Sequence, residues 1–313
     1  MPVIYVLDAF EPSGLQYLAD QNQSFVPFGD PRGINWHQDA VGIMIRGSQL
    51  SADDFARARK LKVVSKQGVG VDNIALSAAR EHGVIVCNTP GINSAAVAEL
   101  AFTLAMAVAR RVSEFDRMIR SGSKIVRPRY LGRAMHGKTI GFIGMGNIGT
   151  QAARLFRGAF DCRILAYDPY APMGHWGDIP HVRIADLEEL WPQVDVLSLH
   201  VPLTDTTRNI VDRAAIARMK PSAIIINVSR GGLIDELALA DALRDGKLFG
   251  AGLDAFEEGE PPSRSNPLLA FPNVLATPHA GAGTIETQAD SSLATARQLL
   301  HVLAGNEPFH RVV

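Results

Sequence analysis

Short apolar segments alternate with amphipathic segments along almost the whole chain, which is the pattern of an α/β protein with parallel sheets. In the first hundred residues, helical segments such as Ala52–Arg59 separate four predicted strands: Val3–Leu7, Val41–Ile45, Leu61–Val64 and Val84–Val86. A second series begins at Thr139 with TIGFIG and continues through Arg163–Tyr167, Val194–Leu199, Ala223–Val228, Gly250–Leu253 and Val274–Ala276. Two such series in a chain of 313 residues predict two α/β domains, each with its own core.

Two segments lie outside this alternation. Ser121–Lys138 is rich in Gly, Arg and Lys and is predicted to be an irregular connection between the two series. Thr284–Leu303 is predicted to be a helix beyond the last strand. A tail of this kind often packs back on the first domain, which would make that domain discontinuous.

The composition is that of a globular protein without a strongly charged partner. The net charge is −1 and the pI is about 6.8, so no nucleic-acid or anionic-membrane partner is expected. MPVIYVLDAF has no signal-peptide pattern, and the apolar segment Ala95–Ala109 contains Glu99 and is too short to span a membrane. Cys87 and Cys162 lie in apolar segments, which favours the reducing cytoplasm over a disulfide framework.

The sequence GFIGMGNIG has the spacing G-x-G-x-x-G between a predicted strand, TIGFI, and a predicted helix, TQAARLFRGAF. Gly144 permits the tight turn, Gly146 lets the backbone approach a pyrophosphate, and Gly149 lets helix and strand pack closely. The helix N-terminus, with Asn147 and Ile148, offers free N–H groups and the positive end of the helix dipole. This context predicts a dinucleotide site.

Asp168 ends the next predicted strand, about 20 residues after the glycine motif. A carboxylate at this place can accept hydrogen bonds from the adenosine ribose hydroxyls and would repel a 2′-phosphate. The predicted cofactor is therefore NAD rather than NADP.

Three further segments place polar side chains at or just beyond the carboxyl end of a predicted strand, where open α/β sheets bind ligands. They carry Arg230 in AIIINVSRGGLID, the acidic sequence GLDAFEEGEPP, and His279 in VLATPHAGAGT. An Arg can hold a carboxylate by two parallel hydrogen bonds. A His beside a nicotinamide can handle a hydroxyl proton, and a carboxylate bonded to that His orients it and favours its protonated form. Together they predict hydride exchange at the carbon next to a carboxylate.

Several motifs occur in one order: GVGVDNI, NTPGINSAAVAE, GMGNIG, LHVPLTDTT, NVSRGGLID and TPHAGAGT. Through them nearly the whole chain resembles the D-isomer-specific 2-hydroxyacid dehydrogenase family, which includes phosphoglycerate dehydrogenases and glyoxylate/hydroxypyruvate reductases. The resemblance implies an NAD-binding Rossmann domain with a doubly wound parallel sheet at 96–283. It also implies a discontinuous flavodoxin-like substrate domain at 1–95 and 284–313, a cleft between the domains, and homodimers built largely through the Rossmann domain.

The resemblance further implies an NAD-dependent oxidoreductase that moves a hydride between the nicotinamide and C2 of a small 2-hydroxy acid. The substrate would be like phosphoglycerate, glycerate (with hydroxypyruvate as its keto form) or glyoxylate. A rival hypothesis is an NAD(H)-sensing corepressor of the same fold, against which stands the lack of long disordered tails. Formate dehydrogenase is disfavoured because it would pair the His with a glutamine.

The matching motif positions imply a role for each site residue. Arg230 would bind the substrate carboxylate, His279 would be the acid/base, and Asp254 would lie near the nicotinamide and tune the environment of His279. The other implied cofactor-binding positions are His200, Val201, Pro202, Thr206, Val228, Ser229, Arg230, His279 and Gly281. The implied substrate-binding positions are Arg46, Val69, Gly70, Arg230 and His279, and no metal site is predicted.

The acidic loop departs from the family pattern. Many relatives read D-x-F-x-x-E-P, but the position five residues after Asp254 is Gly259. Either Glu260 is the catalytic partner of His279, after a one-residue insertion, or Glu258 is. We expect Glu260, because the following proline restricts the direction of the chain. A second departure is the absence, from SGSKIVRPRYLGR, of the tryptophan that the family often has before the Rossmann strand.

Arg46 lies near the carboxyl end of an early predicted strand, in IMIRGSQL. In phosphoglycerate-dehydrogenase-like members an Arg at the matching place faces the far end of the substrate, so Arg46 would recognise a second anionic group. The alternative is a surface Arg that pairs with Asp53 or Asp54.

Overall fold

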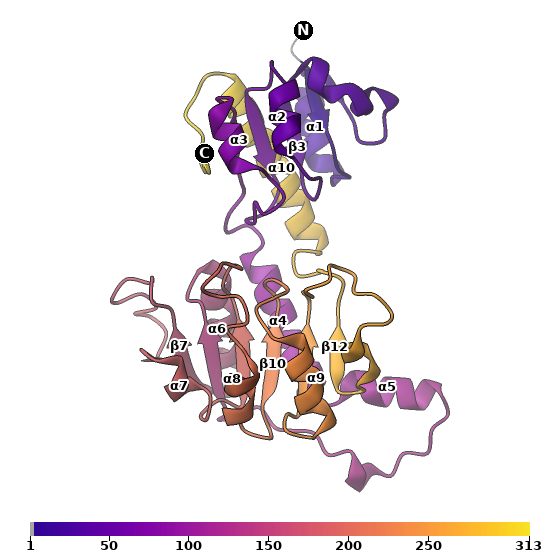
Figure 1. Cartoon of the computed structure of the whole chain (residues 1–313), viewed down its shortest axis with the longest axis vertical. Coiled ribbons are helices and arrows are strands. Elements are labelled where there is room, and N and C mark those ends of the chain that lie inside the picture. Colours follow the sequence, from indigo (N-terminus) through magenta and orange to yellow (C-terminus); the bar gives the residue numbers. More distant parts are fainter. Residues whose placement is uncertain (1–2) are drawn as a thin grey trace. The chain divides into compact units, whose positions relative to one another are not determined.

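The computed structural model describes residues 3–313 and divides into two compact units (Figure 1). Unit 1 comprises Met1–Asn93 and Gly283–Val313, and unit 2 comprises Ser94–Ala282. Each unit has one parallel sheet with helices packed on it. The predicted α/β class with parallel sheets and two domains is confirmed.

Unit 1 is built on a five-stranded sheet in the order β2-β1-β3-β4-β5. This is the flavodoxin-like order. The chain adds β2 on one side of β1 and then adds β3, β4 and β5 on the other side, so the order of strand addition reverses between β1 and β3. The strands are β1 (Val3–Val6), β2 (Phe25–Val26), β3 (Ala40–Ile45), β4 (Val63–Lys66) and β5 (Ile85–Cys87). The helices are α1 (Pro12–Asp20), η1 (Pro31–Gln38), α2 (Ala52–Arg57), α3 (Leu76–Glu81) and α10 (Ile285–Leu303).

The C-terminal helix α10 completes the core of unit 1. It packs against α1, β3 and β4, and its buried residues Ala296 and Leu299 join the same apolar cluster as Met44 and Val63. Gly14 in α1 lets the two helices approach closely, because a Cβ at this position would lie 2.4 Å from the carbonyl oxygen of Ser292. Helix α10 therefore holds unit 1 together from the far end of the chain.

Unit 2 contains a seven-stranded sheet in the order β12-β11-β10-β9-β6-β7-β8. Counted from β6, this is the Rossmann order, and it reverses between β6 and β9. The strands are β6 (Thr139–Ile143), β7 (Arg163–Tyr167), β8 (Val182–Arg183), β9 (Val196–Leu199), β10 (Ile224–Asn227), β11 (Gly250–Leu253) and β12 (Val274–Ala276). The helices are α4 (Ser94–Ala109), α5 (Val112–Arg120), η2 (Arg127–Arg129), α6 (Asn147–Phe160), α7 (Leu187–Leu190), α8 (Arg213–Arg218), α9 (Glu236–Arg244) and η3 (Pro267–Ala270).

The apolar helix α4 lies in the core of unit 2, against α6, β10 and β11. Gly252 in β11 makes room for it, since a Cβ there would lie 2.8 Å from the Cβ of Leu104. Within residues 3–313, no helix is both long and apolar enough to cross a membrane.

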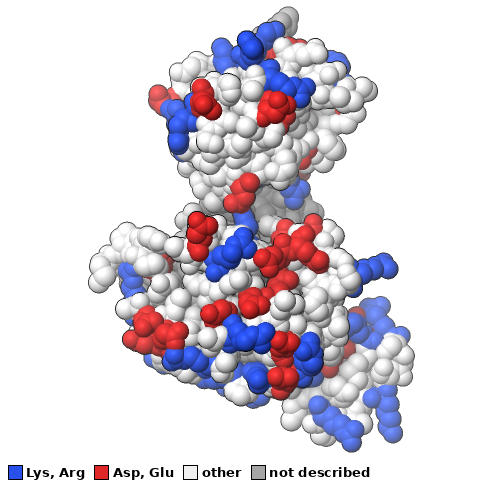
Figure 2. Space-filling model, viewed as in Figure 1, with Lys and Arg blue, Asp and Glu red and all other residues white. Residues whose placement is uncertain are grey.

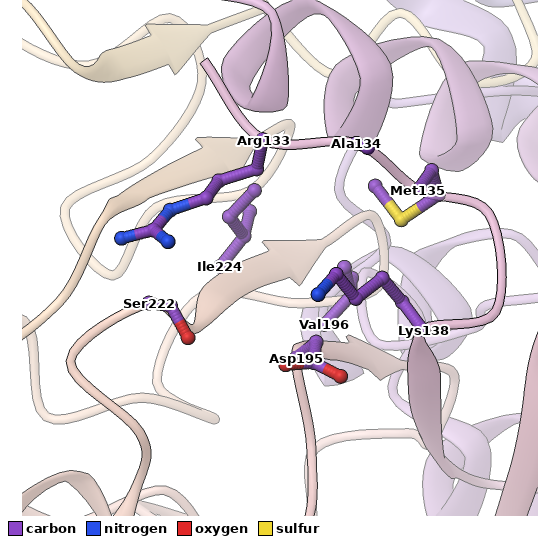
Figure 3. A pocket seen from close by; sticks show the side chains of 8 residues that line it. All are labelled: Arg133, Ala134, Met135, Lys138, Asp195, Val196, Ser222 and Ile224. Atoms are coloured by element: carbon purple, nitrogen blue, oxygen red, sulfur yellow. The ribbon is translucent and has the colours of Figure 1, made fainter. Parts of the chain in front are cut away.

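A small cavity of about 20 Å³ opens at the amino ends of β6, β9 and β10, the opposite edge from the glycine turn (Figure 3). This volume suits about one water molecule. Asp195, in its wall, accepts hydrogen bonds from the Lys220 ammonium (3.1 Å) and from the N–H of Thr139 (3.0 Å). Its carboxylate thus ties the starts of neighbouring strands together.

Candidate active site

The glycine turn joins β6 to α6 at the point where the strand order of unit 2 reverses. Gly144 has φ +101°, and a Cβ on it would lie 2.4 Å from the carbonyl oxygen of His200. A Cβ on Gly149 would lie 2.3 Å from the carbonyl oxygen of Gly144, so only glycine lets α6 approach the turn. Space is open around Gly146, which is the N-cap of α6 and makes no side-chain capping bond. Asn147 begins the helix. The open N-terminus fits a dinucleotide pyrophosphate.

Asp168 follows β7 and connects two loops. Its Oδ2 accepts a hydrogen bond from the N–H of Met145 in the glycine turn (2.9 Å). Its Oδ1 accepts from the N–H groups of Tyr170 (2.9 Å) and Ala171 (3.2 Å). Arg183 holds the same loop by donating to the carbonyl oxygen of Asp168 (2.7 Å). A carboxylate oxygen can accept about two bonds, and Oδ2 of Asp168 accepts one, so Asp168 keeps capacity for a ribose hydroxyl while it shapes the turn.

His200 follows β9 on the other side of the reversal point. Its Nε2 lies 2.9 Å from the Ser198 hydroxyl, and its ring stacks on Phe142 with centroids 5.7 Å apart. Burial lowers the pKa of His200 to about 3, so the ring is neutral. The buried Nδ1 has no hydrogen-bond partner among the described residues, which is compatible with a ligand at this edge. Val201 contacts the turn from the same segment, since its Cγ1 would lie 2.9 Å from a Cβ on Gly144.

The rest of the segment after β9 forms a compact turn. The Thr207 hydroxyl donates to the carbonyl oxygen of Pro202 (2.6 Å), and the hydroxyl groups of Thr204 and Thr206 lie 3.1 Å apart. Pro202 and Thr206 are therefore held within one hydrogen-bonded loop that begins at His200.

The loop after β10 is shaped by Asn227, a residue that the sequence patterns did not single out. Its Nδ2 donates to the carbonyl oxygen of Arg230 (2.8 Å), and its Oδ1 accepts from the N–H of Ser229 (3.1 Å). The Ser229 hydroxyl donates to the carbonyl oxygen of Leu199 in the neighbouring strand β9 (2.9 Å). A Cβ on Gly231 would lie 2.0 Å from the carbonyl oxygen of Phe256. The loop that presents Arg230 is thus fixed from both sides, with Val228 buried beneath it.

Asp254, at the end of β11, organises the loop that carries His279. Its side chain is buried, and its Oδ1 accepts from the Thr277 hydroxyl (2.6 Å) and the N–H of Ala280 (2.7 Å). Its Oδ2 accepts from the N–H of Gly281 (2.9 Å). His279 itself has φ +56° and donates its N–H to the carbonyl oxygen of Asp254 (3.1 Å). The hydrogen bonds that connect Asp254 to the His279 loop therefore go to the backbone and to Thr277.

Of the three glutamates in the acidic loop, Glu260 is the one in contact with the histidine. Its Oε2 lies 3.3 Å from His279 Nδ1, and its Oε1 accepts from the N–H of Phe256 (3.3 Å). Partial burial opposes ionisation of Glu260, but the hydrogen bond and charge of His279, with smaller contributions from the Phe256 N–H and Arg230, lower its pKa. The pair leaves the Nε2 of His279 as the ring nitrogen available to a substrate oxygen.

The other two glutamates have partners of their own. Glu258 Oε1 accepts from the N–H of Ser263 (2.8 Å) and from the Asn266 amide (3.0 Å). Glu257 pairs with Arg208 at 3.1 Å. The N–H of Glu257 donates to Glu236 in α9 (2.7 Å), which anchors the acidic loop to that helix. Burial raises the pKa of Glu236, and the nearby charges of Glu257 and Glu258 raise it further.

The predicted substrate positions in unit 1 follow β3 and β4 at the carboxyl edge of that sheet. Arg46 directly follows β3. Val69 and Gly70 lie in the loop after β4, where Val69 is exposed and its carbonyl oxygen accepts from the Asn88 amide (2.8 Å). Gly68, with φ +98°, donates its N–H to the Thr89 hydroxyl (2.7 Å), which fixes the start of this loop.

Comparison with known proteins identifies the family. Residues 102–281 match the family model described as D-isomer specific 2-hydroxyacid dehydrogenase, NAD binding domain. D-3-phosphoglycerate dehydrogenase of Methanocaldococcus jannaschii is 44% identical over 269 residues, which cover 86% of this chain and 51% of the relative. Hydroxypyruvate reductase of Thermotoga maritima is 43% identical over 250 residues, 79% of each chain. A solved structure of a Thermus thermophilus protein matches with TM-score 0.90 and 36% identity, covering 99% of this chain and 100% of that one.

The chain spans about half the length of the phosphoglycerate dehydrogenase that it matches. The family model covers more than half of the residues, and the relatives exceed 30% identity over most of the chain. The chain belongs to the D-isomer-specific 2-hydroxyacid dehydrogenase family and carries that family's NAD-binding domain.

Proposed function

We propose that the protein is an NAD-dependent D-2-hydroxyacid dehydrogenase that interconverts a 2-hydroxy acid and its 2-keto acid. The observation that carries the proposal is the contact between Glu260 and His279 in the same unit as the glycine turn. A paired His and carboxylate beside a nicotinamide site can move the hydroxyl proton while the hydride moves at C2. The names of the relatives, phosphoglycerate dehydrogenase and hydroxypyruvate reductase, favour this enzyme over an NAD(H) sensor.

Each proposed catalytic residue has a distinct task. Arg230 holds the substrate carboxylate by paired hydrogen bonds and so orients C2. His279 donates its Nε2 proton to the keto oxygen during reduction and accepts it during oxidation. Glu260, at Nδ1 of the same ring, orients His279 and stabilises its protonated form. Bound NAD supplies the hydride chemistry.

The proposed cofactor site follows the carboxyl edge of the unit 2 sheet. The N–H groups at Gly146, Asn147 and Ile148 would bind the pyrophosphate, and the carboxylate of Asp168 would bind the ribose and disfavour a 2′-phosphate. The remaining proposed contacts of the cofactor are Gly144, Gly149, His200, Val201, Pro202, Thr206, Val228, Ser229, Arg230, Asp254, His279 and Gly281.

We propose that unit 1 is the substrate domain. The N–H groups of Val69 and Gly70 would bind the carboxylate of the substrate, and Arg46 would bind a second anionic group at its far end. NADH oxidation with glyoxylate, hydroxypyruvate, 3-phosphohydroxypyruvate and 2-oxoglutarate tests the function. Turnover of at least one 2-keto acid is expected, and turnover of none would refute the proposal.

We propose that the protein is a homodimer in which the second copy covers an arm formed by α5 and residues 121–133. Figure 1 shows this arm running away from the sheet of unit 2. It exposes Val112, Ile119, Val126 and Leu131, with exposed fractions of 56%, 68%, 41% and 72%. Apolar side chains gathered on one projecting segment are typical of a protein contact.

A hollow and a basic surface accompany these apolar positions. The hollow, of about 380 Å³, adjoins α5 and is lined by Glu114, Arg117, Met118, Ser121, Tyr130 and Pro272. Figure 2 shows Lys and Arg side chains along the arm, where residues 112–133 have six of them against two acids, Glu114 and Asp116.

Analytical ultracentrifugation tests the dimer. Ile119→Glu together with Leu131→Glu should give monomers, whereas Ile34→Glu, at an exposed position of unit 1, should leave the mass unchanged. A monomeric wild-type protein would contradict the proposal.

Cytoplasmic location is proposed from the two buried cysteines, Cys87 and Cys162, which are both free thiols.

A further inference from the structure

Asp8 lies just beyond the carboxyl end of β1, next to the end of β3 in the sheet of unit 1. The strand order reverses between these two strands. In open parallel sheets, ligands bind outside the carboxyl ends of the strands at the point of reversal. Asp8 and the turn after β3 therefore occupy the part of unit 1 where the sheet architecture itself favours a ligand.

The carboxylate of Asp8 collects the backbone N–H groups of the turn that begins with Arg46. Oδ2 accepts from the N–H of Arg46 (2.6 Å) and of Gly47 (3.1 Å). Oδ1 accepts from the N–H (3.1 Å) and the hydroxyl (2.9 Å) of Ser48. On the other side of the turn, the Asn73 amide donates to the carbonyl oxygen of Ser48 (2.6 Å). The turn is thus held at three consecutive residues and from two directions.

A carboxylate offers about four acceptor sites. The N–H groups of Arg46, Gly47 and Ser48 and the Ser48 hydroxyl together occupy the acceptor sites of Asp8. Asp8 contacts Arg46 through the backbone N–H and not through the guanidinium. The other candidate partners are also occupied. Asp53 pairs with Arg57 (3.4 Å), and Asp54 pairs with His37 (2.7 Å). Within residues 3–313, the structure gives the exposed Arg46 guanidinium no hydrogen bond or ion pair.

The Arg46 guanidinium lies on a fixed turn, and Asp8, Asp53 and Asp54 all bind other groups. The guanidinium can therefore bind an anion without first breaking an ion pair. Holding the backbone of Arg46 removes backbone freedom that would otherwise be lost when the guanidinium binds an anion. We infer that Asp8 is a positioning residue that directs Arg46, and that this pair makes the enzyme prefer 2-keto acids with a second anionic group at the far end. The inference rests on the proposed substrate role of Arg46.

The test compares a substrate that has a second anionic group, 3-phosphohydroxypyruvate, with one that has none, glyoxylate. Asp8→Asn places an amide N–H₂ against backbone donors and so loosens the turn. Its KM for 3-phosphohydroxypyruvate should rise about tenfold, with kcat changed less than about twofold, because about one charged hydrogen bond is lost. Its kcat/KM for glyoxylate should change less than about twofold. Asp53→Asn, which removes the same charge from an exposed site in unit 1, is the matched control and should match the wild type.

A double-mutant cycle decides whether Asp8 acts through Arg46. Once Arg46→Gln has removed the guanidinium, adding Asp8→Asn should raise the KM for 3-phosphohydroxypyruvate by less than about twofold. Equal losses of kcat/KM for both substrates, or a full tenfold effect in the Arg46→Gln background, would overturn the inference. If Asp8→Asn does not fold, Ser48→Ala removes one donor and should raise the same KM about two- to threefold.

Direct binding separates this inference from the proposed function. If the wild-type protein reduces no 2-keto acid, the proposed function fails. Calorimetric titration with 3-phosphoglycerate can still measure the affinity of the Arg46 site for an anion. An affinity about tenfold weaker in Asp8→Asn supports the inference, and an unchanged affinity or no binding to the wild type overturns it.

Discussion

Replacement of Glu260 by Gln removes a charge from the proposed proton-transfer pair while keeping the size of the side chain. The amide oxygen of Gln can still accept a hydrogen bond from His279 Nδ1, so the ring keeps a partner. Glu258→Gln is a matched control in the same loop, because Glu258 binds Ser263 and Asn266 and does not contact His279. The two variants therefore differ in whether the lost charge lies against the histidine.

The separation of the pair gives the size of the effect. Two opposite charges 3.3 Å apart attract each other by about 1 kcal/mol in water and by about 5 kcal/mol at an effective dielectric constant of 20. The side chain of His279 is 44% exposed and that of Glu260 is 24% exposed, so solvent screening favours the lower end of this range. About 1.4 kcal/mol is a factor of ten in rate. Because reduction needs a protonated histidine, loss of about 1 kcal/mol of this attraction in Glu260→Gln should lower kcat/KM about fivefold on the basic side of the pH–rate profile, which moves that limb to lower pH.

The assay is kcat/KM for reduction of a 2-keto acid, followed by NADH absorbance across the pH range in which each variant stays folded. Glu258→Gln should give the wild-type profile. A shift seen only in Glu258→Gln, or in neither variant, would refute the assignment of Glu260 as the partner of His279.

Four further changes test other parts of the structure. Gly149→Ala would place a Cβ 2.3 Å from the carbonyl oxygen of Gly144, so it should destabilise the fold by about 1–3 kcal/mol and weaken NADH binding at least about tenfold. Gly158→Ala, in the same helix with open space around it, should stabilise the fold by about 0.5–1 kcal/mol in urea unfolding. Arg230→Ala should raise KM about a hundredfold and lower kcat, because the lost carboxylate contact also sets the hydride angle; an unchanged KM in steady-state kinetics would contradict this. Folding raises the pKa of Glu236, so the ionised carboxylate lowers the free energy of unfolding. This loss of stability is present above the pKa of the folded state. It disappears as the pH falls below the ordinary carboxyl pKa of about 4.3, where Glu236 is protonated in both states. Glu236→Gln should therefore be more stable than the wild type at neutral pH and equally stable in acid, as measured by urea unfolding at both values.

Apolar strands of three to five residues were predictable from the sequence because their pattern is local. Arg163–Tyr167, Gly250–Leu253 and Val274–Ala276 begin and end as predicted. The strand predicted at Leu61–Val64 is instead Val63–Lys66, because Ser65 and Lys66 are polar but buried. The two-residue strands β2 and β8 were missed, since a segment of that length has no periodicity.

The candidate site residues could be predicted from the sequence because they come directly after apolar strands. The side chains that hold these residues in place could not be predicted. Asp8 and Thr277 bind groups that only the folded sheet brings near, so no spacing along the chain reveals them. Asn227 bonds to Ser229 and Arg230 in its own loop, but the sequence pattern alone does not show how that loop turns. The choice between Glu258 and Glu260 also depended on the path of a loop. The structure supplies the missing contact, 3.3 Å from Glu260 to His279.

The most direct test of the proposed mechanism is the reduction rate of His279→Ala measured beside its affinity for NADH. If His279 supplies the proton to the keto oxygen, kcat should fall by about 10²–10⁴-fold. The NADH dissociation constant, read by fluorescence titration, should stay within about threefold of the wild type, because the glycine turn and Asp168 are untouched. A variant that turns over at nearly the wild-type rate would contradict the account.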